Sequence, residues 1–116
     1  MGLDACMYKV SPEDAVSCIA VKNDDNFEEI CYWRKFWALH AWMEFLYLKK
    51  GGTDRSFNCK YVQLTEEDLN KLKKECKDFD KSEILFEGDL EDLPSIIDIA
   101  KEEIKKGNCV YYYGDY

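Results

Sequence analysis

His40, the only histidine of the chain, lies four residues before Glu44, a spacing that places both side chains on one face of a helix. A carboxylate beside an imidazole raises the histidine pKa and selects one tautomer, so the two residues are candidates for a general acid–base pair. A buried histidine also needs partners for both ring nitrogens, and a structural role explains the same spacing. The sequence has no second histidine, nucleophile motif or glycine-rich phosphate loop, which favours the structural role and a protein that is not an enzyme.

A second candidate site lies at 32–35 (YWRK). Arginine binds an anion through two parallel hydrogen bonds, lysine binds it as a point charge, and the neighbouring aromatic rings can stack on a planar group. These properties predict a site for a nucleotide-like anion. Its residues are Asp4, Tyr32, Arg34, Lys35, His40 and Tyr112. Alternatively, Arg34 pairs with a nearby acid and only orients the strand layer. The acids in question are Asp4, Glu28 and Glu29.

The six cysteines stand at positions 6, 18, 31, 59, 76 and 109, with no CxxC pair and no CxH or HxxxH pattern beside them. This spacing does not predict a zinc site, and we expect neither a metal nor a cofactor. The first ten residues lack a basic start followed by an apolar run, so we expect no secretory leader. Reduced thiols in a cytoplasm are the state that these features favour.

The net charge of −8, from 24 acidic and 16 basic side chains, sets the character of the surface. A field of this sign repels the phosphates of nucleic acids and of anionic lipids, so we expect direct binding to neither nucleic acid nor membrane. It suits a basic partner protein, including a nuclease whose groove normally holds DNA. The same surplus of carboxylates also keeps a protein in solution, and that explanation needs no partner.

The longest predicted helix runs from about residue 26 to about residue 50. Asp25 or Asn26 is its expected cap, and Gly51 its expected stop. Only two polar side chains interrupt the segment 36–48, so we expect this helix to be buried on all sides.

The other segments complete an α+β pattern within one domain of residues 1–116. Strands are predicted at 5–10, 15–22, 59–64, 82–88 and 109–113. The first two should pair as a hairpin, because Pro12 and its polar neighbours favour a turn. Thr65 and Asp68 predict a capping box at the start of a second helix, and a third helix is expected at 89–106. We therefore predict three helices packed on one face of a small, mainly antiparallel sheet.

Several short motifs occur together in a fixed order along the chain. They are the MGLD start, Tyr8, YWRK at 32–35, His40-x-Trp42, the strand Cys59-x-Tyr61-Val62 and the closing Tyr111-Tyr112-Tyr113. In this order they resemble a family of small proteins encoded by phages and prophages. Members often carry a Leu-Pro-Thr segment and a Gly-Phe-rich loop between the last two helices, where this chain has only KSEILFEG. Any site built from that loop would be trimmed or absent.

The resemblance implies an accessory protein of a phage or mobile element that acts in the cytoplasm of a bacterial host. Together with the small size and the acidity, it leads us to expect a protein that binds a host protein and inhibits or redirects it. An anti-defence inhibitor of the anti-CRISPR type, directed at a nuclease with a basic groove, is one such function. The alternative is a small-molecule binder or enzyme that uses the YWRK segment and His40.

Overall fold

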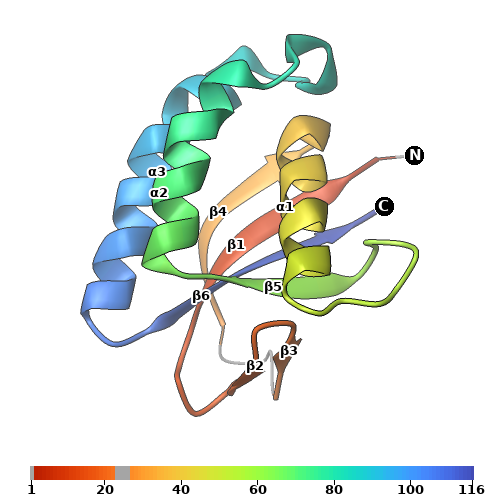
Figure 1. Ribbon diagram of the computed structural model, residues 1–116. Helices are drawn as coiled ribbons and strands as arrows, with labels where there is room; N and C mark the ends of the chain where they lie inside the picture. The colour runs from red at the N-terminus through yellow and green to blue at the C-terminus, as the bar shows by residue number, and fades with distance from the viewer. Residues whose placement is uncertain (1, 23–26) are drawn as a thin grey trace.

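The computed structural model describes residues 2–22 and 27–116, which form three helices on one side of an antiparallel sheet (Figure 1). The strands of this sheet lie in the order β4-β1-β6-β5. They are β1 (Asp4–Val10), β4 (Glu28–Arg34), β5 (Lys60–Leu64) and β6 (Cys109–Asp115). The helices are α1 (Trp37–Lys49), α2 (Glu66–Glu75) and α3 (Glu87–Lys105). The predicted α+β architecture, three helices on a mainly antiparallel sheet, is confirmed.

Smaller elements fill the connections. Strands β2 (Ala15–Ser17) and β3 (Ala20–Val21) form a short hairpin, and two 3₁₀ turns, η1 (Cys76–Asp78) and η2 (Lys81–Glu83), join α2 to α3. The β2-β3 hairpin covers Tyr111, whose hydroxyl donates to the carbonyl oxygen of Ser17 at 2.5 Å. No helix in the described part of the chain has both the length and the apolar character needed to cross a bilayer.

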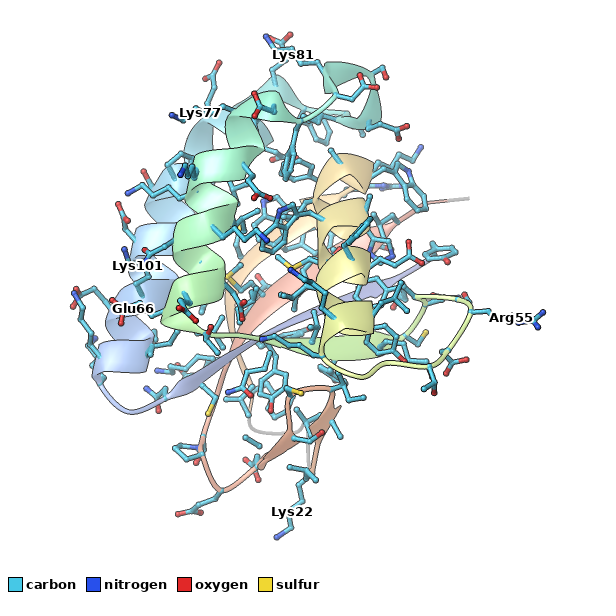
Figure 2. All side chains as sticks on the ribbon, in the orientation of Figure 1. Lys22, Arg55, Glu66, Lys77, Lys81 and Lys101 are labelled. Carbon is cyan, nitrogen blue, oxygen red and sulfur yellow. The ribbon has the colours of Figure 1, made fainter. Side chains whose placement is uncertain are left out.

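Strand β6 shows how the sheet divides its side chains between two faces. Tyr112 points toward the helices and is fully buried, next to Met7 of β1 and Val62 of β5. The following residue, Tyr113, points to the opposite face, where its ring lies 4.6 Å from that of Tyr61. The core therefore lies between the helices and one face of the sheet. Charged side chains project away from the body of the fold; those labelled in Figure 2 are Lys22, Arg55, Glu66, Lys77, Lys81 and Lys101.

The predicted helix from residue 26 to residue 50 is wrong in its first third. Residues 28–34 form β4, which pairs with β1 so that Trp33 lies opposite Ala5. The segment alternates a buried Trp33 with exposed neighbours, and its aromatic and β-branched residues suit a strand. Lys35, with φ of 56°, then turns the chain before α1 begins at Trp37. The expected cap residues, Asp25 and Asn26, lie outside the described residues.

Two strand predictions also need correction. The hairpin between 5–10 and 15–22 does not form, because both edges of β1 are already paired, one with β4 and the other with β6. The segment 15–22 instead folds on itself as β2 and β3. The predicted strand at 82–88 is reduced to a single bridge between Ile84 and Phe36, since a 3₁₀ turn and the start of α3 take the residues around it.

Helix α1 is buried on one side only, which corrects the prediction that it is buried all round. Its inner face consists of Leu39, His40, Met43, Leu46 and Tyr47. On the outer side Phe45 is 73% exposed and Leu48 is 52% exposed. The predicted stop is confirmed, because Gly51 has φ of 101°, a conformation that glycine adopts without steric cost.

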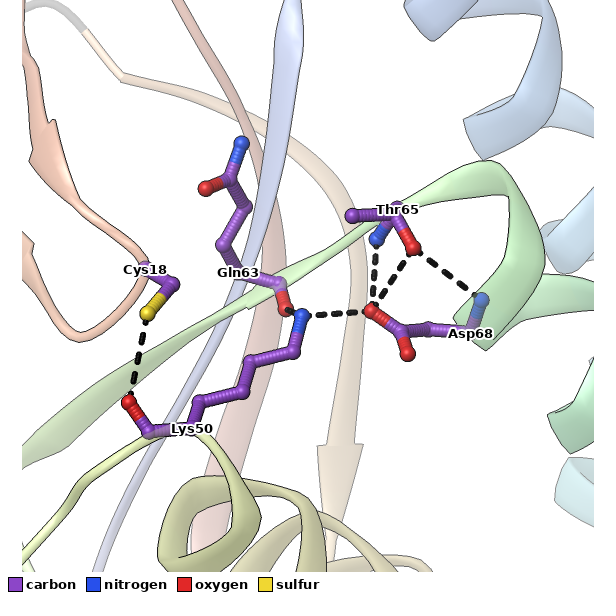
Figure 3. A network of polar contacts seen from close by, with 5 residues as sticks. All are labelled: Cys18, Lys50, Gln63, Thr65 and Asp68. Carbon is purple, nitrogen blue, oxygen red and sulfur yellow. Dashed lines mark hydrogen bonds and ion pairs between the residues drawn. The ribbon is translucent and has the colours of Figure 1, made fainter.

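The start of α2 is tied to the end of α1 by a polar network (Figure 3). Thr65 and Asp68 form the predicted capping box, in which the Asp68 amide donates to Thr65 Oγ1 and the Thr65 amide donates to Asp68 Oδ2. Lys50 donates from Nζ to the same Asp68 oxygen and to the carbonyl oxygen of Gln63, both at 2.5 Å. One half-buried ammonium group therefore links α1, β5 and α2.

The substitution Asp68→Ala removes the helix cap and the ion-pair partner of Lys50 together. We expect the free energy of unfolding to fall by about 2 kcal/mol, because a lost cap costs about 1 kcal/mol and a half-buried ammonium loses a charge-assisted hydrogen bond. Urea unfolding at pH 7 measures the change. Asp98→Ala, which removes an exposed ion pair with Lys73, is the control and should leave the unfolding curve almost unchanged.

The contribution of Asp68 to the free energy of unfolding also depends on pH. Burial opposes the ionisation of Asp68, but the hydrogen bonds from Lys50 and Thr65 outweigh it and hold the pKa of this carboxyl below its usual 3.8. Stability from Asp68 is therefore complete above pH 3.8 and is lost as the pH falls through the lower pKa of the folded state. An unfolding midpoint that is the same in Asp68→Ala and in the unmodified protein at pH 7 would contradict this account.

Candidate functional site

His40 is buried, with 5% of its surface exposed, and both ring nitrogens have partners. Nε2 lies 2.8 Å from the carbonyl oxygen of Phe57, which can only accept, so Nε2 carries the proton. Nδ1 therefore accepts from the Tyr112 hydroxyl at 2.7 Å. Burial lowers the pKa of His40 below its usual 6.5, against a smaller opposing effect of the hydrogen bond to Phe57. The imidazole is neutral at pH 7 and joins α1 to β6 and to the loop before β5.

The expected contact between His40 and Glu44 is not formed. Tyr112 and Phe57 already occupy both ring nitrogens, and Glu44 lies one helical turn farther along, at the surface. A neighbouring carboxylate would have raised the pKa of His40, whereas burial lowers it. The pair therefore does not have the geometry of a general acid–base couple in this structure.

A glycine in β6 allows His40 to lie against the sheet. A Cβ atom placed on Gly114 would lie 2.9 Å from both Cε1 and Nδ1 of the His40 ring. Such a separation is shorter than real Cβ contacts, so a side chain at this position would push α1 away from the sheet. The seating of α1 therefore depends on the absence of a side chain at residue 114.

The six residues predicted to bind an anion separate into two groups. His40 and Tyr112 are hydrogen-bonded in the core, on the helix side of the sheet. Asp4 and Arg34 face each other across β1 and β4 on the opposite side of the sheet, where the Tyr32 hydroxyl donates to Asp4. The six side chains thus do not line one common pocket, and only the group on β1 and β4 remains a candidate anion site.

The alternative role of Arg34, an ion pair with a neighbouring acid, is also absent. Among residues 2–22 and 27–116, Arg34 forms no ion pair with Asp4, Glu28 or Glu29. Arg34 is exposed, and the end of its side chain and that of Lys35 both approach Gly2. Two cationic groups therefore lie together at this end of the sheet.

A hollow of about 780 Å³ lies along the outer side of α1, between this helix and α2. Its apolar lining consists of Ala38, Ala41, Trp42, Phe45, Leu46 and Phe79. Its charged rim consists of Lys49, Glu67, Asp68, Lys71 and Glu75. The Trp42 indole N–H donates to Glu75 at 2.9 Å, which holds the tryptophan ring across the floor of the hollow. An apolar floor with a charged rim is the usual composition of a protein-binding surface.

A second hollow, of about 530 Å³, continues the first toward the N-terminal end of α1. The two share Ala38, Ala41 and Phe79, and we refer to them together as the α1 groove. The second hollow differs in chemistry, because its charged lining residues are all carboxylates and its rim carries no lysine among the described residues. Its distinctive residues are Trp37, Tyr116, Glu44, Asp78, Asp80 and Glu83.

Sequence reasoning missed the α1 groove because it treated every apolar residue of the central helix as core. One feature of the sequence points to the outer face. Residues Ala38, Ala41 and Phe45 recur at helical spacing opposite the buried Leu39 and Met43. A chain of this size has too few elements to cover both faces of the helix, so one apolar stripe was bound to be exposed.

The described residues show little that favours covalent or metal chemistry. Burial raises the pKa of Cys31 to about 11, and it also raises the pKa of Cys6, Cys76 and Cys109. A raised pKa disfavours the thiolate that a nucleophile requires. Within residues 2–22 and 27–116, no three His, Cys, Asp or Glu side chains are grouped so that they could hold a metal ion. The α1 groove is therefore the candidate functional site.

Comparison of the chain with protein-family models, with curated proteins and with solved structures found no match. The resemblance to phage-encoded proteins stays a prediction.

The burial of His40 predicts a pH-dependent stability. Because the pKa of His40 is lowered on folding, the unfolded chain binds a proton more readily, and stability falls as the pH drops below about 6.5. Urea unfolding between pH 7.5 and pH 5.5 measures this slope. The slope should be smaller in His40→Gln, which keeps a donor and an acceptor but does not titrate in this range.

Tyr112→Phe tests the hydrogen bond itself. It leaves Nδ1 of His40 buried without a donor, so we expect the free energy of unfolding to fall by about 1–3 kcal/mol at pH 7.5. The control is Tyr113→Phe, on the opposite face of β6, which should cost less. Equal losses from the two substitutions would show that the hydroxyl of Tyr112 has no special role.

Proposed function

We propose that the protein is a binding module for another protein, which docks in the α1 groove, and that it has no catalytic activity of its own. The observation that carries this proposal is the exposed apolar face of α1. Phe45 is 73% exposed and lines a hollow that also contains Trp42 and Phe79. Large exposed aromatic side chains with a polar rim around them are typical of docking surfaces.

The charge of the protein indicates which partners suit the groove. A net charge of −8 attracts basic surfaces and repels nucleic acid, and the end of the groove near η1 and η2 adds a local excess of carboxylates. We therefore propose a basic segment of a partner protein as the occupant. An amphipathic helix fits best, because its apolar stripe can lie on the floor between α1 and α2 while its basic residues meet the acidic end.

The resemblance to phage-encoded proteins suggests what such binding achieves. In this proposal the protein acts in the cytoplasm of a bacterial host, where it binds a host protein and inhibits or redirects it. A defence nuclease is a suitable target, because its DNA-binding groove is basic. An acidic protein docked there would exclude DNA. An inhibitor of the anti-CRISPR type can act in this way without catalysing a reaction.

Affinity capture from a lysate of the host bacterium tests this function. The bait is the tagged full chain, compared with Phe45→Glu, which places a charge on the apolar floor of the groove. We expect the unmodified protein to enrich a specific basic protein and Phe45→Glu to reduce that enrichment about tenfold or more, because a buried unpaired charge at the centre of an interface is costly. Quantitative mass spectrometry measures the ratio.

The matched control is Ile99→Glu, which makes the same chemical change at another exposed apolar position, in α3 and outside the groove. Ile99→Glu should capture the partner as well as the unmodified protein does. The same set of proteins recovered by all three baits, or no specific protein recovered by any, would overturn the proposal. Thermal unfolding of each bait confirms that the substitutions leave the fold intact.

A further inference from the structure

We propose that the second hollow of the α1 groove is a receptor for one cationic side chain, an arginine or a lysine of the docked partner. This inference rests on the proposed function and deepens it, because it assigns a specific chemistry to one end of the groove. We refer to this hollow, at the N-terminal end of α1, as the cation pocket. It has a volume of about 530 Å³ and lies between α1, η1, η2 and the end of β6.

Two aromatic rings form one wall of the cation pocket. The rings of Trp37 and Tyr116 have centroids 5.3 Å apart and are inclined by 61°, and that of Tyr116 also lies 5.5 Å from the His40 ring. Tryptophan and tyrosine faces attract ammonium and guanidinium groups through the negative potential above the ring. The wall therefore favours a cation independently of any carboxylate.

This aromatic wall is held in place before a ligand arrives. Asn58 accepts from the Tyr116 amide at 2.9 Å and donates to the Tyr116 carbonyl oxygen at 3.2 Å. The Tyr116 hydroxyl also lies 3.2 Å from Ser56 Oγ. Three polar contacts to one loop thus fix a ring at the end of the described chain, so little ordering is left to oppose binding.

Four carboxylates complete the cation pocket, and no lysine or arginine among the described residues lines it. They belong to Glu44, Asp78, Asp80 and Glu83. Within the described ranges 2–22 and 27–116 none of the four forms an ion pair. The nearest lysines in sequence, Lys77 and Lys81, line other hollows and project away from the fold (Figure 2). A docked cation would supply the charge that this pocket lacks.

Two of the groups that face the pocket, Asp80 and His40, favour this negative potential at neutral pH. Asp80 Oδ1 accepts from the amide and the hydroxyl of Ser82, at 3.0 Å and 2.8 Å, and these bonds hold the pKa of Asp80 below its usual value. His40 closes the inner side as a neutral ring, because both nitrogens are engaged and burial lowers its pKa. No positive charge on His40 therefore opposes a cation from inside the pocket.

The position of the cation pocket fits one docked segment. It opens directly into the hollow between α1 and α2 through Ala38, Ala41 and Phe79, which belong to both. At the far end of the groove the rim carries Lys49 and Lys71. A partner helix would thus place its apolar stripe at Phe45 and Trp42 and one basic residue in the cation pocket.

Nuclear magnetic resonance of the 15N-labelled full chain tests the pocket without the partner. The probe is N-acetyl-arginine methylamide, and its neutral isostere, the N-acetyl-citrulline analogue, is the matched ligand. We expect a saturable shift of the Trp37 indole resonance with the arginine probe, with a Kd on the order of 1–10 mM, because a single exposed cation–π and carboxylate contact is weak. The citrulline probe should give no saturable shift, and Trp37→Phe identifies the resonance.

Two matched variants distinguish binding in the cation pocket from a general effect of the net charge. Glu44→Gln removes one carboxylate of the cation pocket and should weaken binding of the arginine probe about three- to fivefold. Glu91→Gln removes the same charge from α3, outside the pocket, and should have no effect beyond that of general charge. Equal shifts with arginine and citrulline, or equal affinities in the two variants, would overturn the cation pocket.

A failure of the cation pocket can be distinguished from a failure of the proposed docking function. If capture of a partner depends on Phe45 but the arginine probe does not bind near Trp37, the cation pocket is wrong and groove docking stands. If the probe binds and no capture depends on Phe45, the pocket is a receptor for a free cation and the docking function is wrong.

Discussion

The structure depends on the way in which one buried histidine seats α1 on the sheet. His40 accepts a hydrogen bond from Tyr112 of the inner strand β6 and donates one to the loop carbonyl of Phe57, while Gly114 leaves room for its ring. These contacts fix the rotation of α1 about its own axis. Because the inner face is set in this way, the opposite face with Phe45 and Leu48 has to point to solvent. The α1 groove is therefore a consequence of a core interaction.

The polar network around Lys50 fixes the other wall of the groove. One ammonium group joins the end of α1 to the capping box of α2, so the two helices are tied together at this point (Figure 3). Trp42 crosses the space between them and is held by Glu75. Trp42, Glu75 and Asp68 of the groove are thus held by hydrogen bonds, a condition that reduces the entropic cost of docking.

The negative charge and the exposed apolar surface together indicate the class of partner that the α1 groove would bind. An exposed apolar surface alone does not specify a partner, and a negative charge alone explains only solubility. The α1 groove combines them in one place, with an aromatic and acidic pocket at one end and a mixed rim at the other. This combination supports a basic, amphipathic partner segment and explains why recognition could proceed without catalytic residues.

The sequence by itself determined the features that depend on neighbouring residues. The capping box of Thr65 and Asp68, the stop of α1 at Gly51 and the α+β class follow from local hydrogen bonding, backbone freedom and periodicity. It also pointed to a structural role for His40, although the partners are Tyr112 and Phe57 and not Glu44.

Only the tertiary structure decided which elements pair and which faces are covered. Residues 28–34 became a strand because β1 offered a free edge, and Tyr32 and Arg34 thereby face the side of the sheet opposite His40. The exposure of Phe45 and the meeting of Trp37 with Tyr116 involve residues distant in the chain. Such contacts depend on packing between whole elements, and no local pattern in the sequence encodes which of two apolar helix faces the core will use.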